Sequence, residues 1–401
     1  MAALRPRSGA ATDAAVLDAI RRVPDTTRTA LAAELGVTAV TITTSVKRLL
    51  ADGLVVETGR ARSTGGKPAS LLRVNTASRW ALGCTIEDDR VALVAMSMDG
   101  VLRFRAVVPL AALLAPALSG EEPASPTPPA SGAPGASDVP SLAAGTLHEL
   151  RAQVEDGRAT CAGIGLTDLR EDPATADAVR SRLEDLLRLS TVAGGAGLCA
   201  GLGSYWMGEQ EEQACLTIHL GPSIDAVVLA GGGPVLPERP GAGTLDHVIV
   251  DPQGPPCTCG GRGCLHQTAS LAADVRRAVA QGLGAELGLD PAGTRTITDH
   301  ARLTEAAAHG HARAGRIVLD SARAIAIAIG NLIGPLGVQR VVLIGTSVSM
   351  APQLYRDAVD AALRERPGAV GEHVVVTVSS VQPHPCSVGA AALALTAVSR
   401  A

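Results

Sequence analysis

The sequence contains almost no aromatic residues: one phenylalanine, two tyrosines and two tryptophans among 401 residues. Aromatic side chains bury the largest area per residue, so their scarcity excludes cores built on aromatic packing. Hydrophobic residues still make up 46% of the chain. The cores must therefore consist of alanine, valine, leucine and isoleucine, and the length predicts two or three domains.

Two targeting features are also missing. No uninterrupted apolar run reaches the roughly 18 residues of a membrane span, and the N-terminus lacks the apolar segment of a secretory signal. We therefore expect a cytoplasmic protein without a membrane partner. Three of the eight cysteines lie within residues 257–264, and clustered cysteines in a reducing compartment favour metal binding over disulfides.

The chain as a whole has no strong excess of either charge, with a net charge of −4. The two parts differ, however: residues 1–75 hold 11 basic and 6 acidic side chains, whereas the remainder holds 24 and 33. A small basic module on an acidic body is typical of a protein that binds phosphates. Chance fluctuation in a short segment is the alternative explanation.

Composition divides the chain at two places. We predict a DNA-binding domain over residues 1–78 and an α/β domain over 79–401, with a disordered insert at 116–140 that is rich in Pro, Ala, Ser and Gly. Periodicity predicts helices and strands in the α/β domain. The strands are 81–84, 91–96, 101–108, 162–166, 214–220, 226–230 and 340–345, and the helices are 142–155, 176–189 and most of 301–333.

The first 50 residues have the pattern of a helix-turn-helix. Apolar spacing predicts helices at 13–22, from Thr27 to a turn at Gly36, and from Thr38 to 50, with both threonines as N-caps. A short second helix with a polar outer side is the geometry that enters the major groove. Two strands at 54–57 and 71–74, joined by a basic glycine-rich tip, complete a wing.

The candidate DNA contacts lie on the second helix, at the start of the helix before it, and on the wing. Threonine hydroxyls can bond base edges or phosphates, and lysine or arginine can bind phosphates. The alternative is a small helical bundle with an ordinary hairpin that contacts proteins. The candidates are Thr27, Arg28, Thr38, Val40, Thr41, Thr44, Lys47, Arg48, Arg60, Arg62, Gly66 and Lys67.

A histidine and three cysteines form the clearest chemical signal. His247, Cys257, Cys259 and Cys264 would complete a tetrahedral shell with no open position, which indicates structural zinc. Free buried cysteines or a disulfide are the alternatives. His266 is a substitute ligand, a neighbour of the shell, or neither.

With these motifs in place, the chain resembles the ROK family of repressors and sugar kinases, in its transcription-factor branch. The resemblance rests on the helix-turn-helix, on Gly-Gly-Lys-Pro at 65–68, on the cysteine motif at 257–265, and on the segment 331–345. It implies a two-lobed, actin-like (ribonuclease H-like) α/β fold with a cleft. It also implies a homodimer or homotetramer.

The residues that carry kinase chemistry in that family are absent here. Its first phosphate loop falls on residues 85–89, where Thr85, Glu87 and Asp89 replace the loop's Asp, Gly and Thr. Its second loop falls on 221–225, where Pro222 removes a backbone donor and Asp225 adds a negative charge. The catalytic Asn-Asp pair aligns with Gly195 and Ala196. We therefore predict no kinase activity.

The family's sugar contacts are also replaced, by Thr244, His266, Thr167 and Asp168, and only His247 remains. The cleft thus binds a different small-molecule effector or none, and the sequence leaves both open. Our first hypothesis is a sequence-specific regulator, acting as a repressor on a DNA operator. The alternatives are a sugar kinase with a DNA-binding appendage and a metal-dependent interaction scaffold.

Overall fold

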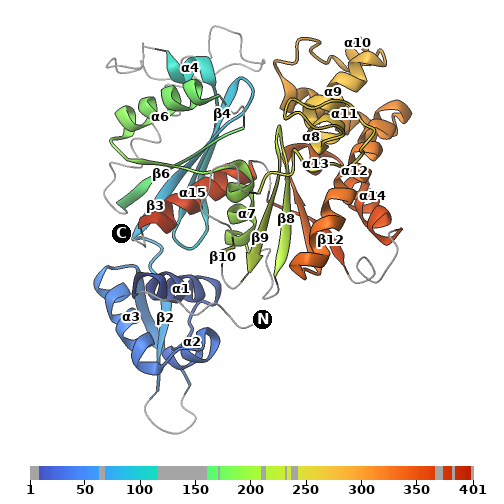
Figure 1. Cartoon of the computed structure of the whole chain (residues 1–401). Helices are drawn as coiled ribbons and strands as arrows, with labels where there is room; N and C mark the ends of the chain where they lie inside the picture. The colour runs from blue at the N-terminus through green and yellow to red at the C-terminus, as the bar shows by residue number, and fades with distance from the viewer. Residues whose placement is uncertain are drawn as a thin grey trace.

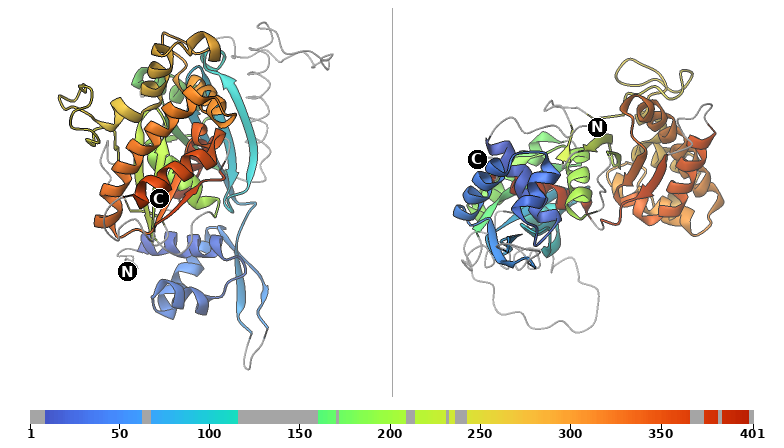
Figure 2. Two further views of the ribbon diagram at one scale, coloured as in Figure 1. Left: turned by 90° about the vertical axis from the view of Figure 1, so that its right-hand side faces the viewer. Right: turned by 90° about the horizontal axis from the view of Figure 1, so that it is seen from below.

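The computed structural model describes residues 9–62, 68–115, 160–169, 172–208, 214–230, 233–235, 243–365, 374–381 and 384–398. A small N-terminal head lies beneath a two-lobed body (Figure 1). Seen from below, the head lies under the lobe that follows it in the chain and away from the other lobe (Figure 2). The predicted insert at 116–140 and the predicted helix at 142–155 lie outside the described residues.

The head is the predicted winged helix-turn-helix. It consists of α1 (Gly9–Arg22), α2 (Arg28–Leu35), α3 (Ala39–Ala51) and an antiparallel pair, β1 (Val55–Arg60) and β2 (Ser70–Val74). Its aliphatic core contains no aromatic side chain. The fully buried members are Val16, Ala19, Ile20, Leu31, Ile42, Val46 and Leu72.

Local chemistry sets the boundaries of α2 and α3 as predicted, whereas α1 begins at Gly9, before the predicted start at residue 13. Thr27 and Thr38 are N-caps whose hydroxyls accept hydrogen bonds from the backbone N–H groups of Ala30 and Thr41. Gly36 ends α2 in the left-handed conformation, with φ 62°, where a side chain would be strained. The turn between the two helices is therefore fixed by three local residues.

Lobe 1 is built on a five-stranded sheet of order β5-β4-β3-β6-β7. Strands β4 (Arg90–Ser97) and β5 (Leu102–Pro109) run antiparallel to their neighbours, and β3 (Arg79–Ile86), β6 (Thr160–Asp168) and β7 (Thr191–Ala193) pair in parallel. Helices α4 (Leu110–Leu114) and α6 (Pro173–Leu187) cover one face, and α15 (Pro385–Val398) covers the other.

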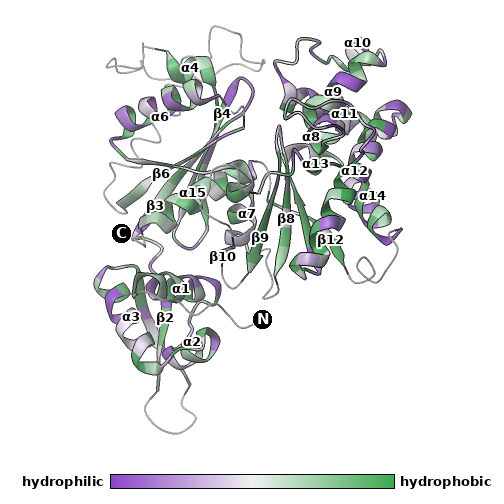
Figure 3. Ribbon diagram, viewed as in Figure 1, coloured by the Kyte–Doolittle hydropathy of each residue, from purple (hydrophilic) through white to green (hydrophobic). Residues whose placement is uncertain are grey.

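Lobe 2 has a second five-stranded sheet, of order β10-β9-β8-β11-β12. Helices α12 (Ala312–Leu336) and α14 (Pro352–Arg364) pack beside this sheet, and several other helices of the lobe lie beyond one end of its strands (Figure 3). The strands are β8 (Cys215–Leu220), β9 (Ile224–Ala230), β10 (Gly233–Pro234), β11 (Arg340–Ile344) and β12 (Val375–Val378). The helices are α8 (Leu265–Ala269), α9 (Leu271–Ala280), α10 (Gly284–Leu287), α11 (Thr296–Ala308), α12 (Ala312–Leu336), α13 (Thr346–Met350) and α14 (Pro352–Arg364).

Helix α7 (Ala196–Trp206) packs between the two lobes, against α15 on one side and β9 on the other. Glycines permit this close approach. A Cβ atom at Gly201 would lie 2.4 Å from Val227 Cγ1 of β9, and one at Gly203 would lie 2.5 Å from the Pro385 carbonyl oxygen at the start of α15. These distances are shorter than van der Waals contact, so only glycine fits, and α7 is tightly packed against both lobes.

Helix α12 is the single described helix that is long and apolar enough to cross a membrane. Half of its most apolar window is buried inside the protein. Ile317, Ile325 and Ile329 on its inner side belong to the core of lobe 2. The predicted helical stretch 301–333 is in fact two helices, because the chain turns at Gly310 with φ 88°.

Candidate DNA interface, metal cluster and cleft

Helix α3 presents a mixed polar and apolar surface to solvent. Val40 is 75% exposed, Thr44 and Lys47 are exposed, and Thr41 is partly buried. Ile42 and Val46 of the same helix are fully buried, and they hold α3 against the head. Lys47 has no ion pair with another described residue, so its charge remains available to a ligand.

The threonine hydroxyls of α3 already make hydrogen bonds within the helix. Thr38 Oγ1 lies 2.9 Å from Thr41 Oγ1, and Thr44 Oγ1 donates to the Val40 carbonyl oxygen at 3.0 Å. Each hydroxyl keeps acceptor capacity. These threonines can therefore accept a hydrogen bond or contact a base through their methyl groups. This limits the base edges that they can recognise.

Two arginines predicted to contact DNA also hold the head together. Arg48 pairs with Asp13 of α1 through two hydrogen bonds of 2.6 and 2.7 Å, and Arg28 pairs with Glu57 of β1 at 3.0 Å. Burial tends to raise the pKa of Asp13, but hydrogen bonds from Arg48 and Ser45 outweigh it and lower that pKa. Contact of either arginine with phosphate stays a prediction.

The wing is formed by the antiparallel pair β1 and β2, whose pairing is irregular at one point. The register shifts between Glu57 and Gly59, and Thr26 adds a bridge to Leu72. Arg60 and Arg62 are exposed, whereas the predicted contacts Gly66 and Lys67 lie outside the described residues. One stabilising contact could not be predicted from the sequence: Thr58 donates a hydrogen bond to Asp25 at 2.6 Å.

The four predicted metal ligands come together in lobe 2. One ligand atom from each of His247, Cys257, Cys259 and Cys264 lies within 4.8 Å of the others. Gly263 permits the loop to close, because a Cβ atom there would lie 1.5 Å from the Asp251 carbonyl oxygen. Three sulfurs and one imidazole at this spacing can hold a metal ion.

The thiols of the cluster differ in pKa. Hydrogen bonds, first from the backbone of Cys259, lower the pKa of Cys257 to about 6. Burial, reinforced by the neighbouring sulfurs, raises the pKa of Cys264 to about 12. The positive charge of a bound cation would offset the repulsion between neighbouring thiolates, so that all three cysteines could be deprotonated. The donor set therefore suits a thiophilic divalent ion such as zinc.

His266 lies outside this cluster. Its Nδ1 is 3.4 Å from Asp246 Oδ2, and this neighbouring carboxylate raises the pKa of His266 despite partial burial. Asp246 also accepts a hydrogen bond from the Ile224 backbone N–H at 2.9 Å. His266 is thus part of the contact between the metal loop and β9.

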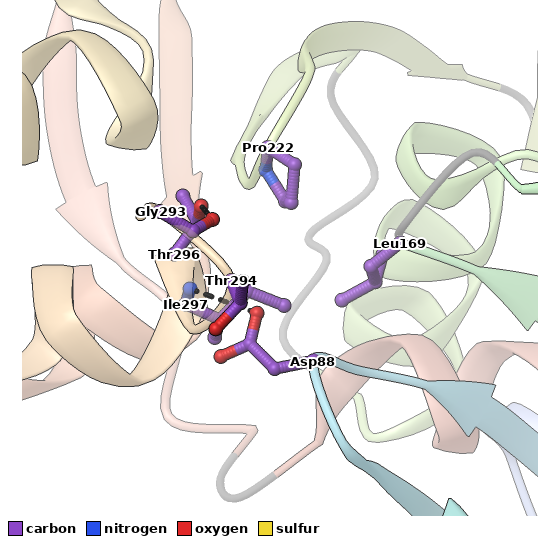
Figure 4. A pocket seen from close by; sticks show the side chains of 7 residues that line it. All are labelled: Asp88, Leu169, Pro222, Gly293, Thr294, Thr296 and Ile297. Atoms are coloured by element: carbon purple, nitrogen blue, oxygen red, sulfur yellow. Dashed lines mark hydrogen bonds between the residues drawn. The ribbon is translucent and has the colours of Figure 1, made fainter. Parts of the chain in front are cut away.

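Between the lobes lies a cavity of about 210 Å³, lined by residues from both (Figure 4). Asp88, at the β3–β4 turn of lobe 1, accepts hydrogen bonds from the backbone N–H groups of Ile297 and Thr298 at 3.1 and 2.9 Å. Those groups open α11 of lobe 2, where a helix favours negative charge. We call this the interlobe contact. The lining residues are Asp88, Leu169, Pro222, Gly293, Thr294, Thr296 and Ile297.

Neighbouring carboxylates are also paired internally. Buried Glu87 lies 2.8 Å from His384 Nδ1, just before α15, and exposed Asp89 lies 3.3 Å from Arg90 Nε. Asp225, after the β8–β9 turn, accepts a hydrogen bond from Ser223 at 2.9 Å and packs against Gly197 in the first turn of α7. The acidic groups at this end of the cleft therefore bind to the protein itself.

Comparison with known proteins assigns the chain to a family. The sequence profile of the ROK family matches residues 178–397, more than half of the chain. The chain belongs to the ROK family. A profile of the MarR family matches residues 10–63, so a MarR-type winged helix precedes the ROK body, which is the architecture of a ROK-family regulator.

Two curated relatives are kinases, and the chain matches each over part of its length. N-acetylmannosamine kinase of Citrobacter koseri is 32% identical over 169 residues, which is 42% of this chain and 53% of that protein. The enzyme of Yersinia pestis is 32% identical over 144 residues, 34% of this chain and 44% of that protein. The chain thus spans about half the length of the curated relatives that it matches.

Solved structures confirm the fold. A ROK family transcriptional regulator, described as a homologue of the E. coli MLC protein, has a TM-score of 0.65 and 17% identity and covers 97% of this chain and 96% of its own. A ROK glucokinase from Streptomyces griseus has a TM-score of 0.54 and 20% identity and covers 78% of this chain and 98% of its own. The likeness to the regulator therefore extends over the head as well.

Within this ROK body, the segments predicted to replace the phosphate loops meet at the cleft. Glu87 and Asp88 project from the β3–β4 turn, and Pro222 lines the cavity. Ala196 is the first residue of α7, and Gly195 is its N-cap. The sequence predicted that these acids would repel a phosphate. It did not predict that they would bind the N-terminal ends of α11 and α15.

Proposed function

We propose that the chain is a sequence-specific, DNA-binding transcriptional regulator that acts as a repressor. The observation that carries this proposal is the exposed surface of α3 and the wing, with Lys47, Arg60 and Arg62, on a head of net positive charge. Such a surface attracts the phosphate backbone, and α3 has the size and position to enter the major groove. The MarR-type profile over this head supports the same function.

The body acts as a scaffold for the head and does not phosphorylate sugars. Ala196 at the catalytic position cannot take a proton from a sugar hydroxyl, and Glu87 and Asp88 place negative charge where a nucleotide phosphate would bind. The cavity between the lobes either takes a small effector or takes none. We expect a homodimer or homotetramer that spaces two heads on half-sites about 10 bp apart, or a multiple of that.

Zinc at His247, Cys257, Cys259 and Cys264 would have a structural role in lobe 2. Four protein ligands leave no position for a substrate, so the ion would supply folding energy and no chemistry. It would tie the long loop before α8 to the start of that helix.

Selection of genomic fragments by the purified full-length chain, followed by sequencing, tests DNA binding. The expected result is a small set of duplexes with a shared, approximately palindromic sequence. A parallel assay with ATP and a panel of hexoses, including N-acetylmannosamine, should give no phosphorylated product. A chain that selects no sequence and phosphorylates a sugar would be a kinase with an appended head.

A further inference from the structure

Two of the five aromatic residues in the chain are adjacent at the end of α7. Tyr205 is buried and Trp206 is partly buried. Both lie against α1 of the head, which is the helix that carries Asp18 and Arg21. In a protein with 1% aromatic content, such a concentration at the junction between the head and the body marks a specific contact.

This contact combines an ion pair, hydrogen bonds and the packing of Arg21 over aromatic rings. The Arg21 guanidinium lies 4.4 Å from the centre of the Trp206 ring and 5.3 Å from that of Tyr205, and Arg21 Nη1 donates to the Trp206 carbonyl oxygen at 3.1 Å. Asp18 binds Arg21 at 2.8 Å and also accepts a hydrogen bond from the Tyr205 hydroxyl. We call Asp18, Arg21, Tyr205 and Trp206 the head–body contact.

The contact is closed to solvent, which increases its strength. The Arg21 side chain is only 6% exposed, and a desolvated arginine over an aromatic ring is held more firmly than one at the surface. Arginine also covers the end of α7, where a cation is favoured by the helix dipole. The head is thus fixed on α7 by a specific contact as well as by the chain connection from β2 to β3.

The opposite end of α7 packs between the lobes, where Cys199 and Ala200 share an apolar cluster with Leu169 of lobe 1 and Ile297 of lobe 2. Asp225 packs against Gly197 in the first turn of α7, and Cys386 of α15 contacts the Ala196 carbonyl oxygen at 3.7 Å. The 11-residue helix spans about 16 Å at 1.5 Å per residue. Because α7 packs against α15 of lobe 1 and β9 of lobe 2, a change in the angle between the lobes must move it.

We propose that α7 couples the cleft to the DNA-binding head, with the head–body contact as its output and the interlobe contact as its input. A change of lobe closure would move α7 and, through Arg21, re-orient α3 relative to the body. The inference deepens the proposed regulatory function and rests on it for the effect on DNA. The mechanical coupling itself can be tested without DNA.

The output end is tested in a Trp80→Phe background, where Trp206 is the one remaining tryptophan. Arg21→Gln should shift the Trp206 emission to longer wavelength and accelerate amide exchange in α1. Tyr205→Phe, which removes one hydroxyl and is easily accommodated, should cause a smaller change in the same direction. Arg323→Gln, in an exposed ion pair on α12, is the matched control and should change neither signal. Unchanged emission and exchange in both head-contact variants would overturn the assignment.

The input end is tested with two adjacent carboxylates. Asp88→Ala removes the interlobe contact, whereas Asp89→Ala removes a side chain that is 69% exposed and pairs with its neighbour Arg90. Coupling predicts that Asp88→Ala alters amide exchange in α1 and that Asp89→Ala does not. Equal exchange in α1 for the wild type and both variants would show that α7 does not connect cleft and head.

DNA provides the functional readout. On a selected duplex with two half-sites, inserting 5 bp between them should weaken wild-type binding, because the half-sites then face opposite sides of the helix. Arg21→Gln should lose this dependence on spacing while its affinity for a single half-site stays within about twofold. Retained spacing dependence would overturn the proposal. Failure of the wild type to bind any duplex would instead contradict the proposed function and leave the two tests above decisive for coupling.

Discussion

The charged residues of the head and those of the cleft differ in whether they have partners within the protein. On the head, Lys47 and Arg62 are exposed and form no ion pair with another described residue. In the cleft, Glu87 and Asp88 are bound by His384 and by the start of α11. A surface that binds a charged ligand keeps its charge available, whereas buried carboxylates need partners within the protein because unpaired buried charge is costly. The comparison supports the proposal that the head, and not the cleft, binds a charged ligand.

Replacing a ligand of the metal cluster should have the largest effect on the stability of the body. The head should not be affected. Cys259→Ser should abolish stoichiometric zinc binding and destabilise lobe 2 by several kcal/mol, since structural zinc supplies about 10–16 kcal/mol in small zinc-finger peptides. Metal analysis and thermal unfolding measure this, with Cys161→Ser as a control outside the cluster. Full metal content in the variant would contradict the proposed ligand set.

The interlobe contact should give the next largest effect. Asp88→Ala leaves two backbone N–H groups at the start of α11 without their acceptor, which costs about 0.5–2 kcal/mol for a helix cap. A lower midpoint in urea unfolding is expected, with no change for Asp89→Ala. If both variants unfolded like the wild type, the interlobe contact would not stabilise the body. The claim that the cleft carboxylates are satisfied internally would then be wrong.

A smaller effect is expected from the ion pair that joins α1 and α3. The pKa of Asp13 lies below its ordinary value of 3.8 in the folded head, so the pair stabilises the head above that pH and this stabilisation is lost as pH falls further. As the pH is lowered below 3.8, the free energy of unfolding, followed by helicity, should fall less in Asp13→Asn than in the wild type. Identical pH profiles would show that the pair contributes nothing.

Restoring one catalytic group should give no activity at all. Ala196→Asp returns a carboxylate to the position of a general base, but Glu87, Asp88 and Pro222 would still oppose nucleotide binding. No product above the wild-type background is expected with ATP and hexoses. Phosphorylation by this variant would mean that the cleft still binds nucleotide. The internal contacts of Glu87 and Asp88 would then not prevent nucleotide binding.

The sequence predicted what depends on neighbouring residues. The caps at Thr27 and Thr38, the turn at Gly36 and the loop that holds the cysteines all follow from local chemistry, and the structure has them. The strands with strong apolar runs were also predicted within one or two residues. These features need no information about what packs against them.

Contacts between distant segments could not be predicted. Asp13 with Arg48, Asp88 with α11, and Arg21 with Trp206 join residues 35 to more than 180 positions apart. Each residue looks like an ordinary surface charge in the sequence. Their partners become known only when the fold brings the segments together, so charge patterns correctly located the DNA-binding module but not the contacts that hold it to the body.

The most direct test of this account is the salt dependence of DNA affinity. A plot of log affinity against log salt for the selected duplex should be steep for the wild type. Lys47→Ala or Arg62→Ala should each reduce its slope by about 0.9, the value for one lost phosphate contact. Asp89→Ala should not lower it. Slopes that are the same in the wild type and both head variants would contradict the claim that the head carries the function.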